Sequence, residues 1–215
     1  MADITLTYKG STIAEMNVSG SKTLKTAGKY CEGDIGVSYV KPSGGGSTDN
    51  EDAIIKRTLT SYSNQRVTTL GSSAFSFCSS LKDVNFPLVT TMGTSCFSAC
   101  YNLESVSMPL LTEIPQNSFT SCNLKKLKFP NLQNIAMSGI RYNSNLETII
   151  LSNSTMCILA NANAFQGSKI ADGTGYIYVP QSLLESYKTA TNWVTYAEQF
   201  RAIEDYPDIC GEATT

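Results

Sequence analysis

A single sequence unit recurs through the middle of the chain and constrains its fold more than any other feature. Phe75, Phe97 and Phe119 follow one another at intervals of 22 residues, and Ile140 follows after 21. A fixed period of about 20–30 residues is typical of solenoid proteins, in which each repeat forms one coil and stacks on its neighbours. The repeat therefore predicts a solenoid over the central part of the sequence.

The other apolar positions of the unit keep the same step. Their columns are Val67, Val89, Leu111, Leu132; Leu70, Met92, Ile114, Ile135; Cys78, Cys100, Cys122; Leu81, Leu103, Leu124, Leu146; Val84, Val106, Leu127, Ile149; and Phe86, Met108, Phe129, Leu151. One unit buries roughly six apolar side chains, worth about 1.5–3 kcal/mol each. Ordering its residues costs about 1–2 kcal/mol apiece in backbone entropy, so a lone unit cannot fold and only a stack is stable.

Within one unit, extended pieces alternate with tight turns. Leu81–Phe86 is predicted to be a strand, and Pro87 follows it at a corner where no ladder donor is needed. Val89–Met92 forms a second extended piece, and a compact turn follows around Ser95–Phe97. Stacked units then predict narrow parallel sheets with strands about 4.8 Å apart. The expected fold class is mainly β with short helices: a small N-terminal β-sheet module, then a parallel β-solenoid with a helical C-terminal cap.

The stretch from Leu70 to Pro87 also resembles a known repeat. It is similar to the BspA-type leucine-rich repeat, whose usual form is I-G-x-x-A-F-x-x-C-x-x-L-x-x-V-x-x-P. The next two units, Met92 to Pro109 and Ile114 to Pro130, match nearly as well, although the second of them is one residue short. The resemblance covers roughly residues 54 to 205. It implies a leucine-rich-repeat scaffold for binding or adhesion, of a kind found on bacterial surfaces and in phage and prophage proteins, and it implies no reaction.

The later units depart from this pattern. In the fourth unit Ile140 replaces the phenylalanine and Asn143 replaces the cysteine, and Leu151 is not followed by proline. The last unit, residues 164 to 180, is stretched by an insertion. Its continuation, Tyr178 to Trp193, resembles the segment that often closes such arrays.

A helical cap is predicted at about residues 180–206, with a tail at 207–215. The second short helix of the cap carries Trp193, Tyr196 and Phe200 on one face. Such an aromatic stripe could be a platform for a ligand. Packing over the last coil of the solenoid is the favoured interpretation.

Residues 1–41 are predicted to form a small N-terminal β module, because apolar and polar residues alternate there in short runs. The module is near the lower size limit for independent stability, so we expect it to lean on a partner. Its pieces Thr5–Gly10 and Leu24–Cys31 are similar to N-terminal segments of phage minor structural proteins. Residues 42–50 form a Gly/Ser-rich linker that lets module and solenoid orient freely, and residues 51–206 form the solenoid with its caps.

Composition and charge exclude several classes of protein. The net charge is −2, charged residues make up 16% of the chain, and no basic run occurs, which argues against nucleic-acid binding. No apolar run approaches the length of a membrane-spanning helix, so no membrane insertion is expected. The first residues lack the basic start and apolar core of a signal peptide. A secreted adhesin would normally need such a signal, which favours a virion component over a surface adhesin.

The sequence offers little material for catalysis. It contains no histidine, which removes Ser-His-Asp and Cys-His arrangements and most metal sites. The seven cysteines are an odd number and mostly follow the repeat, which favours buried thiols over a disulfide framework. Cys96 and Cys100 could approach a metal, but they lack the paired C-x-x-C pattern of a zinc site. A phosphate loop at the three adjacent glycines of the linker lacks its lysine. We therefore predict neither an enzyme nor a cofactor or metal site.

The solvent-facing positions around the Leu-x-x-Val strand form the candidate partner-binding face. One column carries alternating charges on successive units: Lys82, Glu104, Lys125 and Glu147. Opposite charges on adjacent strands attract, so a ladder that fixes the register is the favoured interpretation, with ligand recognition as the alternative. The neighbouring columns vary without pattern, as a recognition surface would. The candidate residues are Lys82, Asp83, Asn85, Glu104, Ser107, Lys125, Lys126, Lys128 and Glu147.

These observations lead to one hypothesis with two alternatives. The chain is expected to be a non-enzymatic phage virion protein, assembled in the host cytoplasm, whose N-terminal module attaches to other virion proteins. Its solenoid is expected to bind a protein or glycan on the host surface. The alternatives are a structural or decorating role, in which the solenoid packs on other virion proteins, and a bacterial cell-surface adhesin. The sequence leaves open the ligand, the position in the virion and whether the chain forms a homo-oligomer.

Overall fold

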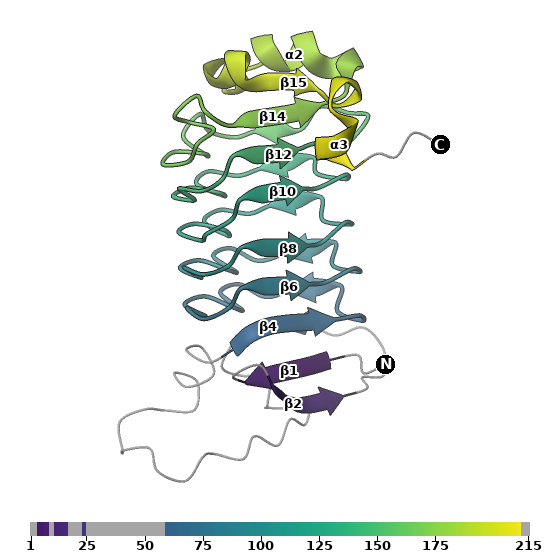
Figure 1. The fold of residues 1–215 in the computed structure, drawn as a ribbon, viewed down its shortest axis with the longest axis vertical. Coiled ribbons are helices and arrows are strands. Elements are labelled where there is room, and N and C mark those ends of the chain that lie inside the picture. Colours follow the sequence, from purple (N-terminus) through teal and green to yellow (C-terminus); the bar gives the residue numbers. More distant parts are fainter. Residues whose placement is uncertain (1–3, 9–10, 17–22, 25–58, 212–215) are drawn as a thin grey trace.

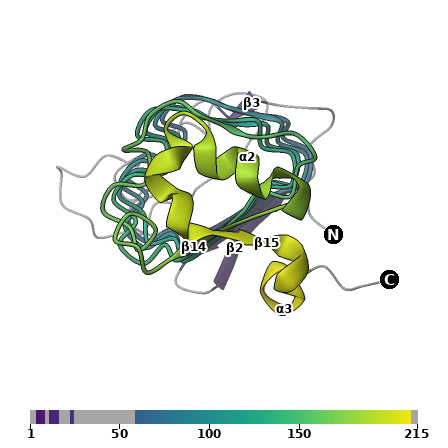
Figure 2. The same cartoon turned by 90° about the horizontal axis from the view of Figure 1, so that it is seen from above.

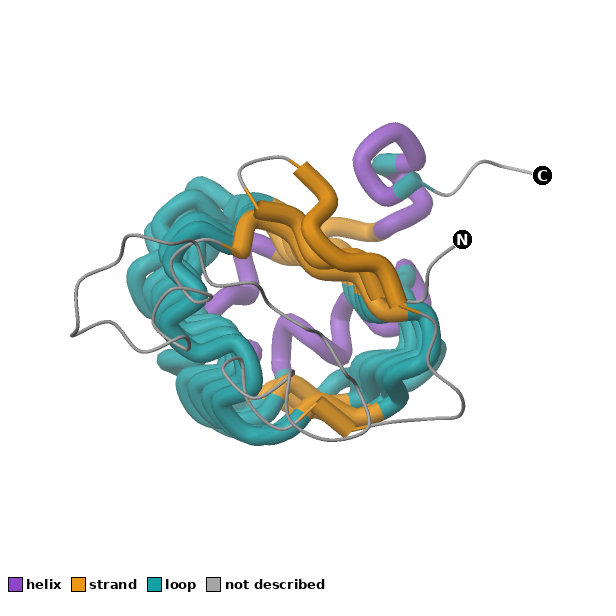
Figure 3. The backbone as a smooth tube through the Cα atoms, turned by 90° about the horizontal axis from the view of Figure 1, so that it is seen from below, coloured by secondary structure: helices purple, strands orange, loops and turns teal. Residues whose placement is uncertain are grey.

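The computed structural model describes residues 4–8, 11–16, 23–24 and 59–211. Short coils stack into a rod with a closed helical end (Figure 1). Each coil contributes one strand to a front side and one to a back side, and Figure 3, along the rod, shows these two strand stacks facing each other across the interior. The predicted parallel solenoid is thus confirmed.

The strands of each side follow the repeat. The front side contains β4 (Leu59–Asn64), β6 (Asp83–Asn85), β8 (Ser105–Ser107), β10 (Lys126–Lys128), β12 (Thr148–Ile150), β14 (Tyr176–Val179) and β15 (Phe200–Ala202). The back side contains β5 (Thr69–Leu70), β7 (Thr91–Met92), β9 (Glu113–Ile114), β11 (Asn134–Ile135) and β13 (Ile158–Leu159). Strands β6, β8, β10 and β12 contain three residues each, fewer than the predicted stretch Leu81–Phe86. Lys82 and Phe86, near the ends of that stretch, still donate their N–H groups to neighbouring coils.

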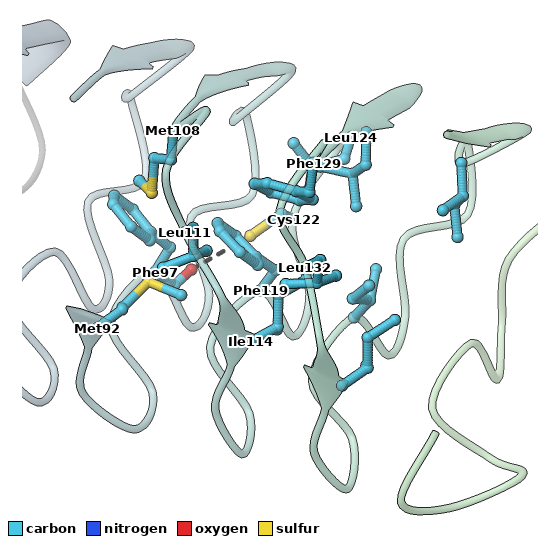
Figure 4. Packing of buried hydrophobic residues seen from close by; sticks show 14 of the residues in the cluster. Met92, Phe97, Met108, Leu111, Ile114, Phe119, Cys122, Leu124, Phe129 and Leu132 are labelled. Atoms are coloured by element: carbon cyan, nitrogen blue, oxygen red, sulfur yellow. Dashed lines mark hydrogen bonds between the residues drawn. The ribbon is translucent and has the colours of Figure 1, made fainter. Parts of the chain in front are cut away.

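Phenylalanine rings fill the interior of the first coils. The ring centroids of Phe75 and Phe97 are 5.0 Å apart and those of Phe97 and Phe119 are 5.4 Å apart, with interplanar angles of 5° in both pairs. All three side chains are fully buried, and Figure 4 shows Phe97 and Phe119 among the surrounding aliphatic side chains. The column that defines the period in the sequence is therefore one file of stacked rings.

The cysteine column forms a second file, of hydrogen-bond donors. The thiol of Cys100 donates to the carbonyl oxygen of Phe75 at 3.0 Å, one coil earlier, and Cys122 donates to that of Phe97 at 3.2 Å, the dashed line in Figure 4. In the fourth unit the amide of Asn143 donates to the Phe119 carbonyl at 2.7 Å. The position thus requires a small buried donor, and asparagine replaces cysteine in that role.

Both sides of the solenoid are interrupted at one place. The front strands divide into two sheets, ordered β2-β1-β4-β6-β8 and β10-β12-β14-β15, and the back strands divide between β7 and β9. On the back side, Gly93 and Ala136 donate their backbone N–H to the preceding coil, and Pro115 at the equivalent position has no N–H to donate. On the front side, the interruption falls where the third unit lacks one residue, between Cys122 and Leu124.

The turns of the coils contain residues in the left-handed backbone conformation, which the sequence did not predict. Two positions per coil have positive φ: Ser73, Ser95, Asn117, Ser138 at the first and Phe77, Ala99, Ser121, Tyr142 at the second. Glycine is the residue that usually takes this conformation, yet the positions named here carry other residues. The backbone N–H groups around these turns donate to the next coil, as from Phe97 to Ser118, so the ladder holds the conformation in place.

The C-terminal helices close the rod. They are η1 (Gln181–Leu183), α2 (Leu184–Thr189) and η2 (Trp193–Gln199), and Figure 2 shows them over the end of the coil stack. Their side chains bond the open edge of β13. The Tyr187 hydroxyl accepts the N–H of Cys157 at 2.7 Å, and the Trp193 indole donates to the carbonyl of Cys157 at 2.8 Å. The aromatic stripe of Trp193, Tyr196 and Phe200 is buried, so it packs the last coil and is no exposed platform.

The N-terminal strands join the solenoid directly. β1 (Ile4–Tyr8) pairs antiparallel with both β2 (Ser11–Met16) and β4, and β3 (Thr23–Leu24) pairs parallel with β5. They cover the edge of the first coil, whereas the linker predicted from the sequence implied a module free to orient. That linker, at 42–50, and the first predicted solenoid residues, 51–58, lie outside the described residues.

Candidate interaction face

The outward-pointing residues of the front strands form one continuous surface, here called the front face. Strand register places them in two columns. The first column is Ser61, Asp83, Ser105, Lys126, Thr148 and Tyr176, and the second is Ser63, Asn85, Ser107, Lys128, Ile150 and Tyr178. Alternation along each strand makes this arrangement unavoidable once the apolar residues between them face the core.

The N-terminal half of the front face is open to solvent. Asp83, Asn85, Ser105 and Ser107 are all exposed, whereas Val84 between them is buried in the core. Partial burial of the Asp83 carboxylate raises its pKa, and the ammonium of Lys82 lowers it to a smaller extent. This half is a small polar surface on a rigid frame.

The predicted charge ladder is present in part. Lys125 pairs with Glu104 at 3.2 Å, which joins the coils on either side of the front interruption. Glu147 pairs with Lys169 at 2.6 Å, a partner supplied by the insertion in the last unit. All four side chains are largely exposed, and exposed ion pairs contribute only about 0–1 kcal/mol. These pairs therefore help to align neighbouring coils without deciding the stability of the fold.

Part of the C-terminal half of the front face, around Ile150 and Tyr178, is covered by the chain itself. Residues after Pro207 were expected to be a tail, but Pro207–Cys210 form the helix α3, which Figure 2 shows outside the ring of coils. The ammonium groups of Lys126 and Lys128 donate to the carbonyls of Ile209 and Cys210. Two of the predicted partner-binding residues are thus engaged within the chain.

One sequence signal could have revealed this covering. Ile150 and Tyr178 occupy the second outward column, where the preceding coils carry Asn85, Ser107 and Lys128. Both are buried, and together with Ile203 and Cys210 they form an apolar cluster separate from the main core. An apolar residue in an otherwise polar outward column indicates that another segment lies over it.

The cysteines that the structure describes are buried and form no disulfide. Burial raises the pKa of both Cys122 and Cys157 to about 12. Burial also raises the pKa of Cys96 and Cys100, the pair considered for a metal. Thiolate is the species that binds metal and attacks electrophiles, so these side chains are suited to packing. Among the residues that the structure describes, no cluster of histidine, cysteine or carboxylate side chains could hold a metal ion.

An open groove lies beside the cap, between the residues around β13 and the start of η2. It measures about 580 Å³ and is lined mainly by apolar groups of Met156, Ile158, Leu159 and Trp193. Its lining includes no carboxylate, lysine or arginine, and burial raises the pKa of the one thiol in it, that of Cys157. None of the helices within the described ranges is long and apolar enough to cross a bilayer.

The repeat identifies the family of the chain. The model of the BspA type leucine rich repeat region matches residues 56–171, in six copies, which is more than half of the sequence. The chain belongs to this family. No curated protein matched the sequence.

A solved structure of a leucine-rich repeat protein shares the fold. A leucine-rich repeat protein from Bacteroides ovatus superposes with a TM-score of 0.52 at 23% identity, covering 68% of this chain and 37% of that one. A leucine rich cell surface protein from Faecalibacterium prausnitzii (TM-score 0.43, 17% identity, 68% and 32% covered) and the pneumococcal vaccine antigen PcpA (0.41, 18%, 66% and 39%) are more distant. The chain therefore spans less than two fifths of the length of each.

Proposed function

We propose that this BspA-type solenoid is a non-enzymatic binding module that attaches a larger assembly to a partner on a cell surface. The supporting observation is the open half of the front face. It offers exposed polar side chains of varied chemistry, Asp83, Asn85 and Ser107 among them, on strands fixed by the stacked core. Such a surface can be altered residue by residue without disturbing the coils beneath it, which suits recognition.

The finer proposal is a role in a phage particle. In this role the N-terminal strands attach the chain to other virion proteins, and the front face binds a protein or glycan of the host. The resemblance of residues 5–10 and 24–31 to phage structural proteins supports this assignment. The pairing of β1 with β4 then transmits force from the attachment point directly into the front sheet.

A charge substitution on the front face tests binding. Asp83→Arg with Ser107→Arg should reduce binding of the full chain to susceptible cells at least tenfold, because both positions are exposed on adjacent strands. Thr91→Arg with Glu113→Arg is the matched control, since it makes the same charge change at exposed positions of the back side. Equal binding by both double variants would contradict a role for the front face.

Cell fractionation distinguishes a binding protein of a phage particle from one on the bacterial cell surface. In a lysate of the producing cells, the chain should sediment with intact phage particles, where an antibody against it detects it. Labelling of intact, unlysed cells instead would favour the alternative of a bacterial cell-surface adhesin. Burial of Asp83 and Ser107 against other virion proteins in a particle map would favour the structural alternative.

A further inference from the structure

The helix α3 is attached to the front face by a small and self-contained set of contacts. Lys128 donates to the Cys210 carbonyl at 2.7 Å, and Lys126 donates to the carbonyl of Ile209. These two oxygens belong to the last turn of the helix, where carbonyls have no partner within the helix. Gly211, with φ of +69°, ends the helix. The lysines therefore recognise the backbone of a helix end, with no side chain of α3 taking part.

The apolar part of the attachment is equally local. Cys210 is buried against Ile150 and Tyr178, and the rings of Tyr178 and Tyr206 meet edge to face with centroids 5.4 Å apart. This cluster lies on the outside of the front strands and is separate from the core that runs through the rod. Removing α3 would therefore uncover a shallow apolar strip without opening a cavity inside the coils.

The helix itself has little stability of its own. It contains four residues, far fewer than an isolated helix needs in water. Of these four, only Cys210 is buried, and Pro207, Asp208 and Ile209 are exposed. The contacts with the front face, and not the helix itself, therefore stabilise α3 in this position.

We propose that the front face over β10, β12 and β14 is a docking site for a short peptide turn, which residues 206–211 occupy in cis. The site has two elements. The ammonium groups of Lys126 and Lys128 bind the last two carbonyls of the turn, and the strip of Ile150 and Tyr178 takes a small apolar side chain. A partner protein binds there by presenting a turn of this chemistry and displacing α3. The inference is independent of which cell or particle the solenoid recognises.

Covalent connection explains why the cis occupant prevails in the isolated chain. A tethered segment acts at an effective concentration in the millimolar range. A partner turn must exceed this competition, either through higher affinity or through additional contacts on the adjoining open half of the face. The open half begins one strand away, at β8, so one partner can contact both halves.

The first experiment compares two neighbouring aspartate substitutions in the full chain. Cys210→Asp places a carboxylate against the strip of Ile150 and Tyr178 and should release α3, whereas Ile209→Asp changes an exposed residue and should leave it docked. The probe is a fluorescent synthetic peptide of residues 203–215 with the natural sequence. It should bind the Cys210→Asp chain at least tenfold more tightly than the natural chain or the Ile209→Asp chain. Adding Lys126→Met and Lys128→Met should abolish this gain.

The second experiment requires no released variant. Lys126→Met with Lys128→Met in the full chain removes both ammonium groups and keeps most of each aliphatic stem. Amide hydrogen exchange at residues 209–211 should accelerate at least tenfold, with the exchange of β12 and β14 unchanged. Lys82→Met with Lys125→Met is the control, because these lysines make no contact with α3 among the described interactions.

Three results would overturn the proposal. Peptide binding that is no tighter to the Cys210→Asp chain than to the natural chain would show that the face is no docking site. Unchanged exchange at residues 209–211 in the Lys126→Met, Lys128→Met chain would show that the lysines do not hold α3. Loss of cooperative unfolding in the Cys210→Asp chain would show that α3 is part of the solenoid core.

Discussion

The two blocks of the solenoid on either side of the interruption keep the same coil with different interiors. The N-terminal block contains the stacked rings of Phe75 and Phe97, and the file continues across the interruption to Phe119. Further along the C-terminal block Ile140 takes the ring position and Asn143 takes the thiol position, and rings pack against one another again where Phe165 meets the cap. Each coil therefore needs an apolar side chain that fills its interior and one buried hydrogen-bond donor, and more than one residue type can supply each.

The interruption shows which contacts hold neighbouring coils together when strand pairing fails. Across it, the turn ladder persists: Ser95, Phe97 and Ala99 donate their N–H groups to the next coil. The loss of strand pairing on the front and back sides is therefore tolerated, because the hydrogen bonds between turns and the stack of phenylalanine rings continue across the interruption. The blocks can be compared by substitutions that remove one of these contacts at a time.

The largest effect is expected from breaking the ring file. Phe97→Ala removes a fully buried ring between two stacked neighbours and should lower the free energy of unfolding by about 3–5 kcal/mol. Guanidinium unfolding followed by circular dichroism measures this loss. The control is Phe77→Ala in the same block, where the ring is 61% exposed and the change should stay within about 0.5 kcal/mol. A loss below about 1 kcal/mol for Phe97→Ala would contradict the central role of the file.

A substitution in the donor file tests the C-terminal block. Asn143→Leu leaves the N–H of Leu124 and the carbonyl of Phe119 without the amide that now bonds both. Each buried polar group left without a partner costs about 1–3 kcal/mol. The combined loss should therefore exceed that of Cys100→Ala, because the Phe75 carbonyl that loses the thiol still accepts the N–H of Cys78. Denaturant unfolding of the two variants gives the comparison. Equal losses would mean that asparagine merely fills space here.

Gly93, in the N-terminal block, lies against the backbone of the preceding coil. A Cβ atom there would come within 2.3 Å of the backbone nitrogen of Ser72, which neither coil can relieve without moving its backbone. Gly93→Ala should therefore cost about 1–3 kcal/mol, as overpacking does. The matched change in the other block, Ala136→Gly, should cost only about 0.5–1 kcal/mol from added backbone freedom. A tolerated Gly93→Ala would show that the two coils are less tightly fixed than their contact indicates.

The smallest effect is a gain that should be the same in both blocks. Ser95 and Ser138 have φ values of +56° and +57° at equivalent positions of the turn. Glycine avoids the cost of this conformation, about 1–2 kcal/mol for other residues, and loses part of the gain through its greater freedom when unfolded. Ser95→Gly and Ser138→Gly should each raise the free energy of unfolding by up to about 1 kcal/mol. A rise in the melting temperature of only one variant would show that the two turns differ.

Much of this fold could be predicted because the repeat fixes each residue relative to its copies. The columns identified the core, and the file of Phe75, Phe97 and Phe119 followed from their spacing alone. The left-handed turn residues could not be predicted, since serine and phenylalanine carry no signal for positive φ comparable with that of glycine.

The candidate face was harder to predict because it depends on contacts between distant segments. Lys126 and Lys128 were identified as outward residues, but their partners lie 83 and 82 residues further along the chain, beyond the repeat. Periodicity determines which way a side chain points and gives no information on what later covers it. Ile150, apolar in a polar column, was the one local hint of the covering segment.

The way in which the cap meets β13 has a consequence for the growth of such rods. Tyr187, Asn192 and Trp193 bond backbone groups of the last coil, so the closing segment fits the backbone at that end of the rod. Duplication of an internal 22-residue segment would lengthen the molecule by one coil, about 4.8 Å, and leave its closure intact. Adding coils beyond the cap would require a new capping segment. Internal duplication is therefore the simpler way for related solenoids to differ in length.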